Sequence, residues 1–109
     1  MKLLNSCCGN PTLEETDSIP GEEAVMRQAL FLKSLADPAR IRIVYALKNR
    51  ELCACEIMAL LKMPQAMVSH HCKILKIAGI IADRKSGRWV HYSLVEPGAL
   101  EILKAINNK

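Results

Sequence analysis

The sequence predicts a mainly α-helical fold with a single β-hairpin, and three observations carry this prediction. Apolar residues recur at helical spacing through most of the region from Glu22 to Ala78. Prolines follow Asp37 and Met63, and each of these steps interrupts the helical pattern. Beyond Gly79, two short segments separated by a turn have the residue pattern of paired strands. At 109 residues, the chain is long enough for one domain with a modest core.

The first two helices are predicted on either side of Asp37. The first begins at Glu22, because acidic residues suit a helix N-terminus. Pro38 suits the first turn of the second helix, which runs to about Asn49. The apolar positions are Val25, Ala29, Leu32 and Leu35 in the first helix and Ile41, Val44, Tyr45 and Leu47 in the second.

A short helix and a longer helix follow, joined by a tight turn at Met63-Pro64. The short helix spans about residues 54–62, with Ile57, Leu60 and Leu61 on its apolar side. The longer helix spans residues 65–78 and stops at Gly79, because glycine is common just past a helix end.

The C-terminal part is predicted to form the hairpin and a last helix. Strands at residues 80–83 and 89–95 flank a turn at residues 85–88, and the last helix begins at Pro97. Its apolar stripe is Leu100, Leu103 and Ile106. A short helix, a tight turn, a longer helix and a hairpin together make a winged helix-turn-helix. We expect a homodimer, because a chain this small with apolar helix faces often completes its core by pairing.

The N-terminal segment differs from the rest of the chain. Residues 1–20 show little apolar periodicity and are expected to form a flexible arm that carries a cysteine pair, whereas residues 21–109 form the winged helix-turn-helix and dimerisation domain. No apolar run approaches the ~20 residues of a membrane span, and the N-terminus lacks the apolar core of a signal peptide. We therefore expect a cytoplasmic protein without a membrane partner, whose five cysteines stay reduced.

Positive charge is concentrated in one region of the chain. The net charge is only +4, but residues 62–92 carry six basic residues against Asp83 alone, whereas residues 1–24 carry five acids and one lysine. The six are Lys62, Lys73, Lys76, Arg84, Lys85 and Arg88. A localised basic patch indicates a polyanionic partner, although it is also compatible with a merely solvated face. In a helix-turn-helix, double-stranded DNA is the expected partner.

The helix at residues 65–78 has a polar face with the chemistry needed to read DNA. At about 100° per residue, this face gathers Gln65, Ser69, Lys73 and Lys76, with Ala66 and His70 beside it. Glutamine pairs with an adenine edge, serine and histidine reach bases or phosphates, and lysine meets phosphate. His71 and Cys72 fall on the apolar side and are expected to be packed.

Three basic residues flank the predicted hairpin turn: Arg84, Lys85 and Arg88. Basic residues at the tip of a wing suit contact with phosphates or with the minor groove. The alternative is a turn that these charges only keep soluble.

Four cysteines are candidate ligands for a metal ion. Cys53 and Cys55 precede and enter the short helix. Residues two apart in a regular helix point about 200° from each other, whereas extended geometry at the helix start places both on one side. Thiolates select soft ions, and Cys7 and Cys8 in the arm are the obvious source of further sulfur ligands. The alternative is two small buried residues and an inert pair in the arm.

The sequence resembles the ArsR/SmtB family of metal-sensing winged-helix repressors over roughly residues 24–106. Four stretches carry the resemblance: LADPARIRI at 35–43, ELCACE at 51–56, VSHHCKIL at 68–75 and GRWVHYSL at 87–94. The resemblance implies a homodimer, formed by the first and last helices, that binds operator DNA and leaves it when a metal binds.

The same resemblance bears on the choice of ion. Cys53 and Cys55 match the family's Cys-x-Cys site, and Cys7 and Cys8 resemble the arm cysteines that cadmium and lead sensors add. Arsenite sensors use three thiolates at varied positions, so arsenite and antimonite fit as well. The family's zinc-type site on the last helix needs histidine, and residues 96–109 contain none. We therefore expect a soft metal or metalloid as inducer and no organic cofactor.

Two features depart from the family's pattern. Residues 63–67 lack the hydroxyl side chains that usually open the family's reading helix, and Cys72 stands where leucine normally follows the second histidine. A thiol redox or persulfide sensor remains an alternative within the same fold. A thiol oxidoreductase or a metal-sequestering protein is disfavoured, because Cys-x-Cys lacks thioredoxin-like spacing and a sequestration protein needs no reading helix. No catalytic constellation is visible, so we do not expect an enzyme.

Overall fold

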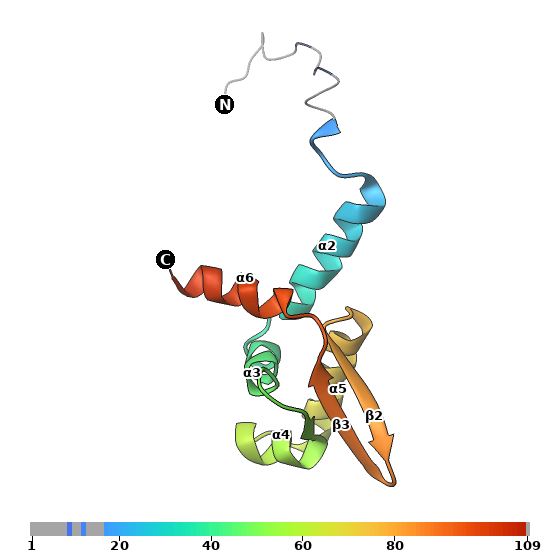
Figure 1. Ribbon diagram of the computed structural model, residues 1–109, viewed down its shortest axis with the longest axis vertical. Coiled ribbons are helices and arrows are strands. Elements are labelled where there is room, and N and C mark those ends of the chain that lie inside the picture. The colour runs from blue at the N-terminus through green and yellow to red at the C-terminus, as the bar shows by residue number, and fades with distance from the viewer. Residues whose placement is uncertain (1–8, 10–11, 13–16, 109) are drawn as a thin grey trace.

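The computed structural model describes residues 9, 12 and 17–108. The elements are α2 (Glu22–Leu35), α3 (Pro38–Ala46), β1 (Leu52–Cys53), α4 (Ala54–Leu61), α5 (Gln65–Ile77), β2 (Ile81–Ser86), β3 (Trp89–Leu94) and α6 (Gly98–Asn107). In Figure 1, α3, α4 and α5 gather in the body, the β2–β3 hairpin extends beside α5, and α2 and α6 lie at the opposite end. This arrangement is the predicted winged helix-turn-helix, with α4 and α5 as its two helices.

Local chemistry sets the boundaries of the helices. The backbone of Asp37 is extended, and its Oδ2 accepts hydrogen bonds from the N–H groups of Ala39 (2.9 Å) and Arg40 (3.3 Å). An N-cap of this kind stabilises a helix by about 1 kcal/mol. After α5, Gly79 adopts a φ of 81°, which glycine reaches without the steric cost that a Cβ imposes.

The three strands form one antiparallel sheet in the order β1-β3-β2. His91 in the central strand pairs with Cys53 of β1 on one side and with Arg84 of β2 on the other. The hairpin closes between Ser86 and Trp89, and Gly87 in its turn has a φ of 63°. The sheet therefore connects the start of α4, where Cys53 lies, to the wing.

The core lies between the body helices and the sheet. Its largest fully buried aliphatic side chains are Ile43, Val44, Leu52, Ile57, Val68, Leu75 and Ile80. They come from α3, α4, α5, β1 and the segment before β2, so the helix-turn-helix and the wing share one apolar core. Because burial of apolar surface contributes about 25 cal/mol per Å², this shared core keeps α5 fixed relative to the wing.

Two predicted boundaries were wrong, and one strand was not predicted. Helix α3 ends at Ala46 rather than near Asn49, because the N–H of Lys48 bonds to the carbonyl of Tyr45 in a tighter turn. Strand β2 continues to Ser86, so the turn is shorter than predicted. The two-residue β1 was not predicted, because two residues carry no periodic signal.

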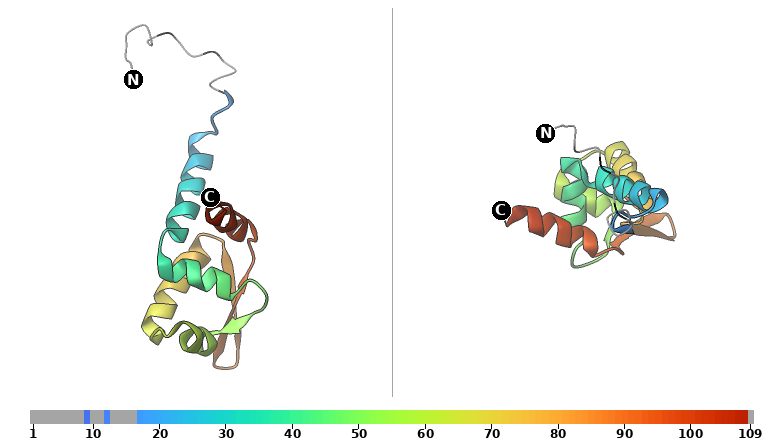
Figure 2. Two further views of the ribbon diagram at one scale, coloured as in Figure 1. Left: turned by 90° about the vertical axis from the view of Figure 1, so that its left-hand side faces the viewer. Right: turned by 90° about the horizontal axis from the view of Figure 1, so that it is seen from above.

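Helices α2 and α6 lie close to each other, and residues of both line one groove. Figure 2 shows α6 beside the part of α2 that enters the body. Within the described residues, no helix has the length and apolar character needed to cross a membrane.

Candidate nucleic-acid interface and thiol site

The reading helix α5 is buried along only one side. Val68, His71, Cys72 and Leu75 are its buried residues, and they occupy about 100° of the helix circumference. The six DNA contacts predicted on α5 are all exposed: Gln65, Ala66, Ser69, His70, Lys73 and Lys76. Met67 lies in the N-terminal half of α5, and although it is apolar its side chain is 44% exposed. The exposed face is therefore broader than the sequence indicated and begins at the helix N-terminus.

The N-terminus of α5 is turned outward and begins without a side-chain cap. Pro64 precedes it in an extended conformation, and the Pro64 carbonyl accepts from the N–H groups of Met67 and Val68, both at 3.1 Å. The exposed N–H groups of a first turn, together with the helix dipole, favour a phosphate group. The main-chain N–H groups of the first turn of α5 can therefore bind an anion, although residues 63–67 have no hydroxyl side chain that could do so.

The basic residues of the wing differ in the side chains that they contact. Arg84 makes two hydrogen bonds to Glu51, at 2.7 and 2.9 Å, and this pairing lowers the pKa of the Glu51 carboxyl below its usual value. The guanidinium of Arg88 lies 5.6 Å from the centre of the Trp89 ring. Lys85 is exposed, and no carboxylate of the described residues pairs with it. Arg88 and Lys85 are thus presented at the wing tip, whereas Arg84 also braces the base of the wing.

The cysteines of β1 and α4 are accessible. Cys53 is the N-cap of α4 with an extended backbone and is half-buried, whereas Cys55 is exposed in the first turn. The N–H of Cys53 donates to Glu56 Oε1 at 2.8 Å, and this backbone hydrogen bond lowers the pKa of Glu56. Within the described residues, no group of three or more histidine, cysteine and acidic side chains is placed to hold a metal ion. Cys7 and Cys8, the predicted source of further ligands, lie outside the described residues.

Cys72 has a different environment. Its side chain is 1% exposed and packs in the core, and burial raises the pKa of its thiol to about 12. The sequence-based expectation of a packed thiol is confirmed.

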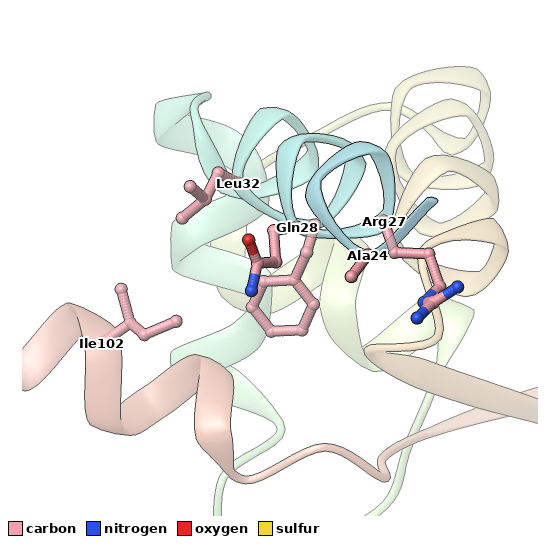
Figure 3. A pocket seen from close by; sticks show the side chains of 6 residues that line it. Ala24, Arg27, Gln28, Leu32 and Ile102 are labelled. Atoms are coloured by element: carbon pink, nitrogen blue, oxygen red, sulfur yellow. The ribbon is translucent and has the colours of Figure 1, made fainter. Parts of the chain in front are cut away.

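An apolar groove runs between α2 and α6. Its lining is Ala24, Arg27, Gln28, Phe31 and Leu32 of α2 with Ile102 of α6, and Figure 3 shows Ile102 facing Leu32 and Gln28. Further apolar side chains lie exposed on the same two helices: Val25, Met26, Leu30 and Ile106. The single chain leaves this surface uncovered, which is costly for apolar side chains in water.

Comparison with known sequences identifies the family. Residues 37–83, from the cap of α3 into β2, match the family described as bacterial regulatory protein, arsR family. A helix-turn-helix transcriptional regulator of Methanocaldococcus jannaschii is 40% identical over 86 residues, which are 78% of this chain and 97% of that protein. The chain belongs to the ArsR family. Members of this family are transcriptional regulators rather than enzymes, which agrees with the absence of a catalytic motif.

Other relatives of this ArsR-family chain carry more specific names. The arsenical resistance operon repressor of Escherichia coli is 43% identical over 65 residues, 59% of this chain and 56% of that protein. A cadmium resistance regulatory protein CadC homologue of Staphylococcus aureus is 40% identical over 70 residues, 63% of this chain and 56% of that protein. The match thus spans little more than half the length of these two relatives.

Solved structures have the same fold. The transcriptional repressor PagR of Bacillus anthracis superposes with a TM-score of 0.68 at 29% identity, and the match covers 79% of this chain and 99% of that one. HlyU from Vibrio cholerae gives a TM-score of 0.71 at 24% identity, over 81% and 96% of the two chains. The winged helix-turn-helix of this ArsR-family protein is therefore shared with known regulators.

Sequence reasoning missed two features that lie close to the site. One is the Glu51–Arg84 pair, whose partners are 33 residues apart and meet only because β1 joins the sheet. The other is a contact between Arg40 and His71, which joins two motifs that the sequence shows separately. Neither has a local signal, since both depend on the register of the folded chain.

Proposed function

We propose that this protein is a repressor that responds to a thiophilic metal or metalloid. The homodimer binds operator DNA without the ion and leaves it when the ion binds cysteine thiolates. The observation that carries the proposal is the combination, in one small body, of an exposed reading face on α5 and accessible thiols at the start of α4. Arsenite or antimonite and cadmium or lead are the candidate inducers.

The exposed groups of α5 support DNA binding through the major groove. Gln65 and Ser69 lie on the N-terminal half of the helix, which does most base reading in a helix-turn-helix. Lys73 and Lys76 follow on the same face, where lysines can contact phosphates. The Lys76 Nζ also forms an ion pair with Asp83 at 3.1 Å. The wing adds Lys85 and Arg88, with Arg84 behind them, for the phosphate backbone or the minor groove.

The thiols and the relatives' names support a soft ion as inducer. Cys53 and Cys55 are accessible at a helix start, where Cys53 has the extended backbone that allows joint ligation. Cys7 and Cys8 complete the ligand set in this proposal, since three or four sulfur ligands suit thiophilic ions. The names of the two relatives above refer to arsenical and cadmium resistance.

The uncovered groove between α2 and α6 supports a homodimer. A second copy would cover Leu32 and Ile102 with the same residues of its own, as in an isologous interface. Two reading helices held at a fixed separation would then match two half-sites of an operator.

The sheet offers a route from the thiols to the wing. Neighbouring positions on β1, β3 and β2 are occupied by Cys53, His91 and Arg84. Glu51, two residues before Cys53, forms an ion pair with Arg84. An ion that pulls Cys53 toward other ligands shifts β1 and therefore the base of the wing. Release of DNA then follows if the ion-bound form has the poorer fit to the operator.

The decisive experiment follows operator binding during titration with ions. A duplex is first enriched from a randomised pool by binding to reduced wild-type protein. Fluorescence anisotropy of that duplex is then recorded with arsenite, antimonite, cadmium, lead and zinc. We expect release by one group of thiophilic ions and not by zinc.

Single cysteine variants test the ligand set in the same titration. Cys7→Ser, Cys8→Ser, Cys53→Ser and Cys55→Ser should bind the duplex but lose release, whereas Cys72→Ala is the matched control that keeps both. Release by every ion, or unchanged release in Cys53→Ser and Cys55→Ser, would contradict the proposed site. Release by an oxidant without any ion would favour the thiol redox alternative.

Two further variants separate base reading from phosphate contact. Gln65→Ala should relax the base preference at one position at a cost of about 1–3 kcal/mol. Arg88→Ala should instead weaken binding to all sequences alike and reduce its salt dependence. Equal effects of both variants on every sequence would argue against Gln65 as a base reader.

Sedimentation equilibrium tests the proposed dimer. Leu32→Glu places a charge in the groove and should give a monomer, because an unpaired charge is costly in an apolar interface. Leu60→Glu is the control, since Leu60 is equally exposed but lies on α4 away from the groove. If the wild-type protein is a monomer, or if Leu32→Glu is still a dimer, the groove is not a dimer interface.

A further inference from the structure

Arg40 of α3 joins the end of α2 to the reading helix α5. Its Nε donates to the carbonyl of Ser34 at 2.6 Å, and its Nη2 donates to the carbonyl of Lys33 at 3.4 Å. Its Nη1 lies 3.1 Å from Nδ1 of His71. Lys33 and Ser34 belong to the last turn of α2, where a cation is favourable, and the Lys33 carbonyl also accepts from the N–H of Ala36 at 3.2 Å. One guanidinium therefore contacts two other helices.

This contact requires a neutral His71. Guanidinium groups only donate hydrogen bonds, so Nδ1 must accept and the ring proton must lie on Nε2. His71 is 8% exposed, and its burial lowers the pKa of the imidazole below 6.5; Asp37 acts in the opposite direction, and Arg40 and His70 add to the lowering. The neutral ring is thus the form that fits this position near neutral pH.

A second proton on His71 would change the partner of its Nδ1 from Arg40 to Asp37. The new N–H at Nδ1 would face the cationic Arg40, whereas Asp37 Oδ2 lies 4.0 Å away and accepts hydrogen bonds. That oxygen already caps α3 through the N–H groups of Ala39 and Arg40, so a shift toward His71 would also disturb the cap.

The other charged groups around α5 do not provide this exchange. The His70 ring lies 5.1 Å from the His71 ring but is exposed toward solvent. Asp83 of β2 pairs with Lys76, and Glu56 of α4 pairs with Arg50 and the Cys53 N–H. Within the described residues, Asp37 and Arg40 are therefore the groups that compete for His71.

We propose that Arg40 and His71 are positioning residues for DNA binding, which hold α5 at a fixed angle to α2 only while His71 is neutral. The inference rests on the proposed operator binding. In the proposed dimer, α2 carries the interface and α5 carries the reading face, so the link between them sets the separation of the two reading helices. Neither residue touches DNA in this role.

The sign of the pH effect follows from the lowered pKa of His71. Above the unfolded value of 6.5, the ring is neutral in the folded and unfolded chains and the link is complete. As the pH falls below 6.5, the unfolded chain binds the proton first, so the stability contributed by the link decreases until the pH passes the lowered folded pKa. Operator affinity depends on the folded protein, so it should fall as the pH approaches and passes the lowered pKa of folded His71.

The test compares pH profiles of operator binding for matched variants. Because the chain has two other histidines, all proteins carry His70→Asn and His91→Asn, and the probe is the duplex enriched above. Anisotropy between about pH 5 and 8 should show an affinity that falls with decreasing pH, by up to about tenfold per pH unit for each proton taken up. Adding His71→Asn, whose amide oxygen takes the place of Nδ1, should keep the neutral-pH affinity and abolish the pH dependence.

Two more variants exclude a purely structural effect. His71→Leu fills the same space without a hydrogen-bond acceptor, and Arg40→Lys keeps the charge but loses the three directed donors. Both variants should bind the duplex about tenfold more weakly at neutral pH, and their affinity should no longer depend on pH. Thermal unfolding identifies which of the two remains folded. Nitrogen chemical shifts of histidine-labelled protein should also show an unprotonated Nδ1 on His71 at neutral pH.

The outcomes separate this inference from the proposed function. If folded His71→Leu and Arg40→Lys bind with the affinity and pH profile of their parent, or if Nδ1 carries the proton at neutral pH, the positioning role is overturned. If wild-type protein enriches no duplex from the pool, the proposed function itself fails, and the role of the pair in DNA binding fails with it. Only the first result leaves operator binding intact.

Discussion

The three cysteines within the described residues occupy two opposite environments on neighbouring helices. Cys53 and Cys55 stand at the start of α4, half-buried and exposed, whereas Cys72 in the middle of α5 is 1% exposed. All three belong to motifs of the same helix-turn-helix. The difference teaches that position along a helix decides what a thiol does: a helix start leaves it accessible to ligands, and the packed face of a central helix makes it part of the core.

The largest expected difference is in reaction with an alkylating agent. Burial raises the pKa of Cys72 from 9.0 to about 12, so its thiolate fraction is about 1000-fold below that of an ordinary thiol. Native protein treated with iodoacetamide should be modified at Cys55 and Cys53 long before Cys72. Peptide mass spectrometry over time measures the rates, and denatured protein serves as the control. Comparable rates at all three positions in the native state would remove the contrast.

The next largest difference is in affinity for the inducing ion. Loss of a ligand should cost more than the 10–100-fold that loss of a supporting hydrogen bond costs, so we expect at least about 100-fold weaker binding for Cys53→Ser and Cys55→Ser. Cys72→Ala should bind as wild type does. Competition with a chelator, followed by the thiolate-to-metal absorption band, gives the constants. Weakened binding in Cys72→Ala would show that the core thiol contributes a ligand.

Most of the fold could be predicted because strong local signals mark its boundaries. Asp37-Pro38 caps and opens α3, and Gly79 ends α5 with a positive φ, as their residue types require. The burial of His71 and Cys72 also followed from helical spacing. These features depend on residues that are neighbours in sequence.

Other parts of the site could not be predicted, because they depend on contacts between distant segments. Strand β1 exists only where Leu52 and Cys53 pair with β3, and that pairing brings Glu51 to Arg84. The exposure of Met67 depends on how closely α4 and the sheet cover α5, which the helical wheel does not show. Whether Cys7 and Cys8 reach the other thiols is a prediction that the described residues do not test.

The same substitution should have opposite effects on stability at the two kinds of site, and the larger effect is at Cys72. Cys72→Ser places a hydroxyl in the core and should lower the free energy of unfolding by about 1–3 kcal/mol. Urea denaturation at neutral pH with reductant present measures the change. Cys72→Ala is the control that removes the sulfur without adding a polar group. If serine is no worse than alanine here, the hydroxyl has found a partner and the site is less apolar than its burial indicates.

The smallest expected effect is a gain from Cys53→Ser. Cys53 occupies the N-cap of α4, where its sulfur takes the place of a hydroxyl in a capping box with Glu56. Sulfur is a weak acceptor, whereas serine is among the preferred N-cap residues, so the substitution should raise the free energy of unfolding by about 0.5–1 kcal/mol. Urea denaturation of the ion-free protein measures the gain, and Cys53→Ala should lose it. A destabilised Cys53→Ser protein would mean that Cys53 contributes to the core as Cys72 does. A helix cap that serine improves is instead a position where cysteine costs stability, which is the pattern expected of a residue kept for its chemistry.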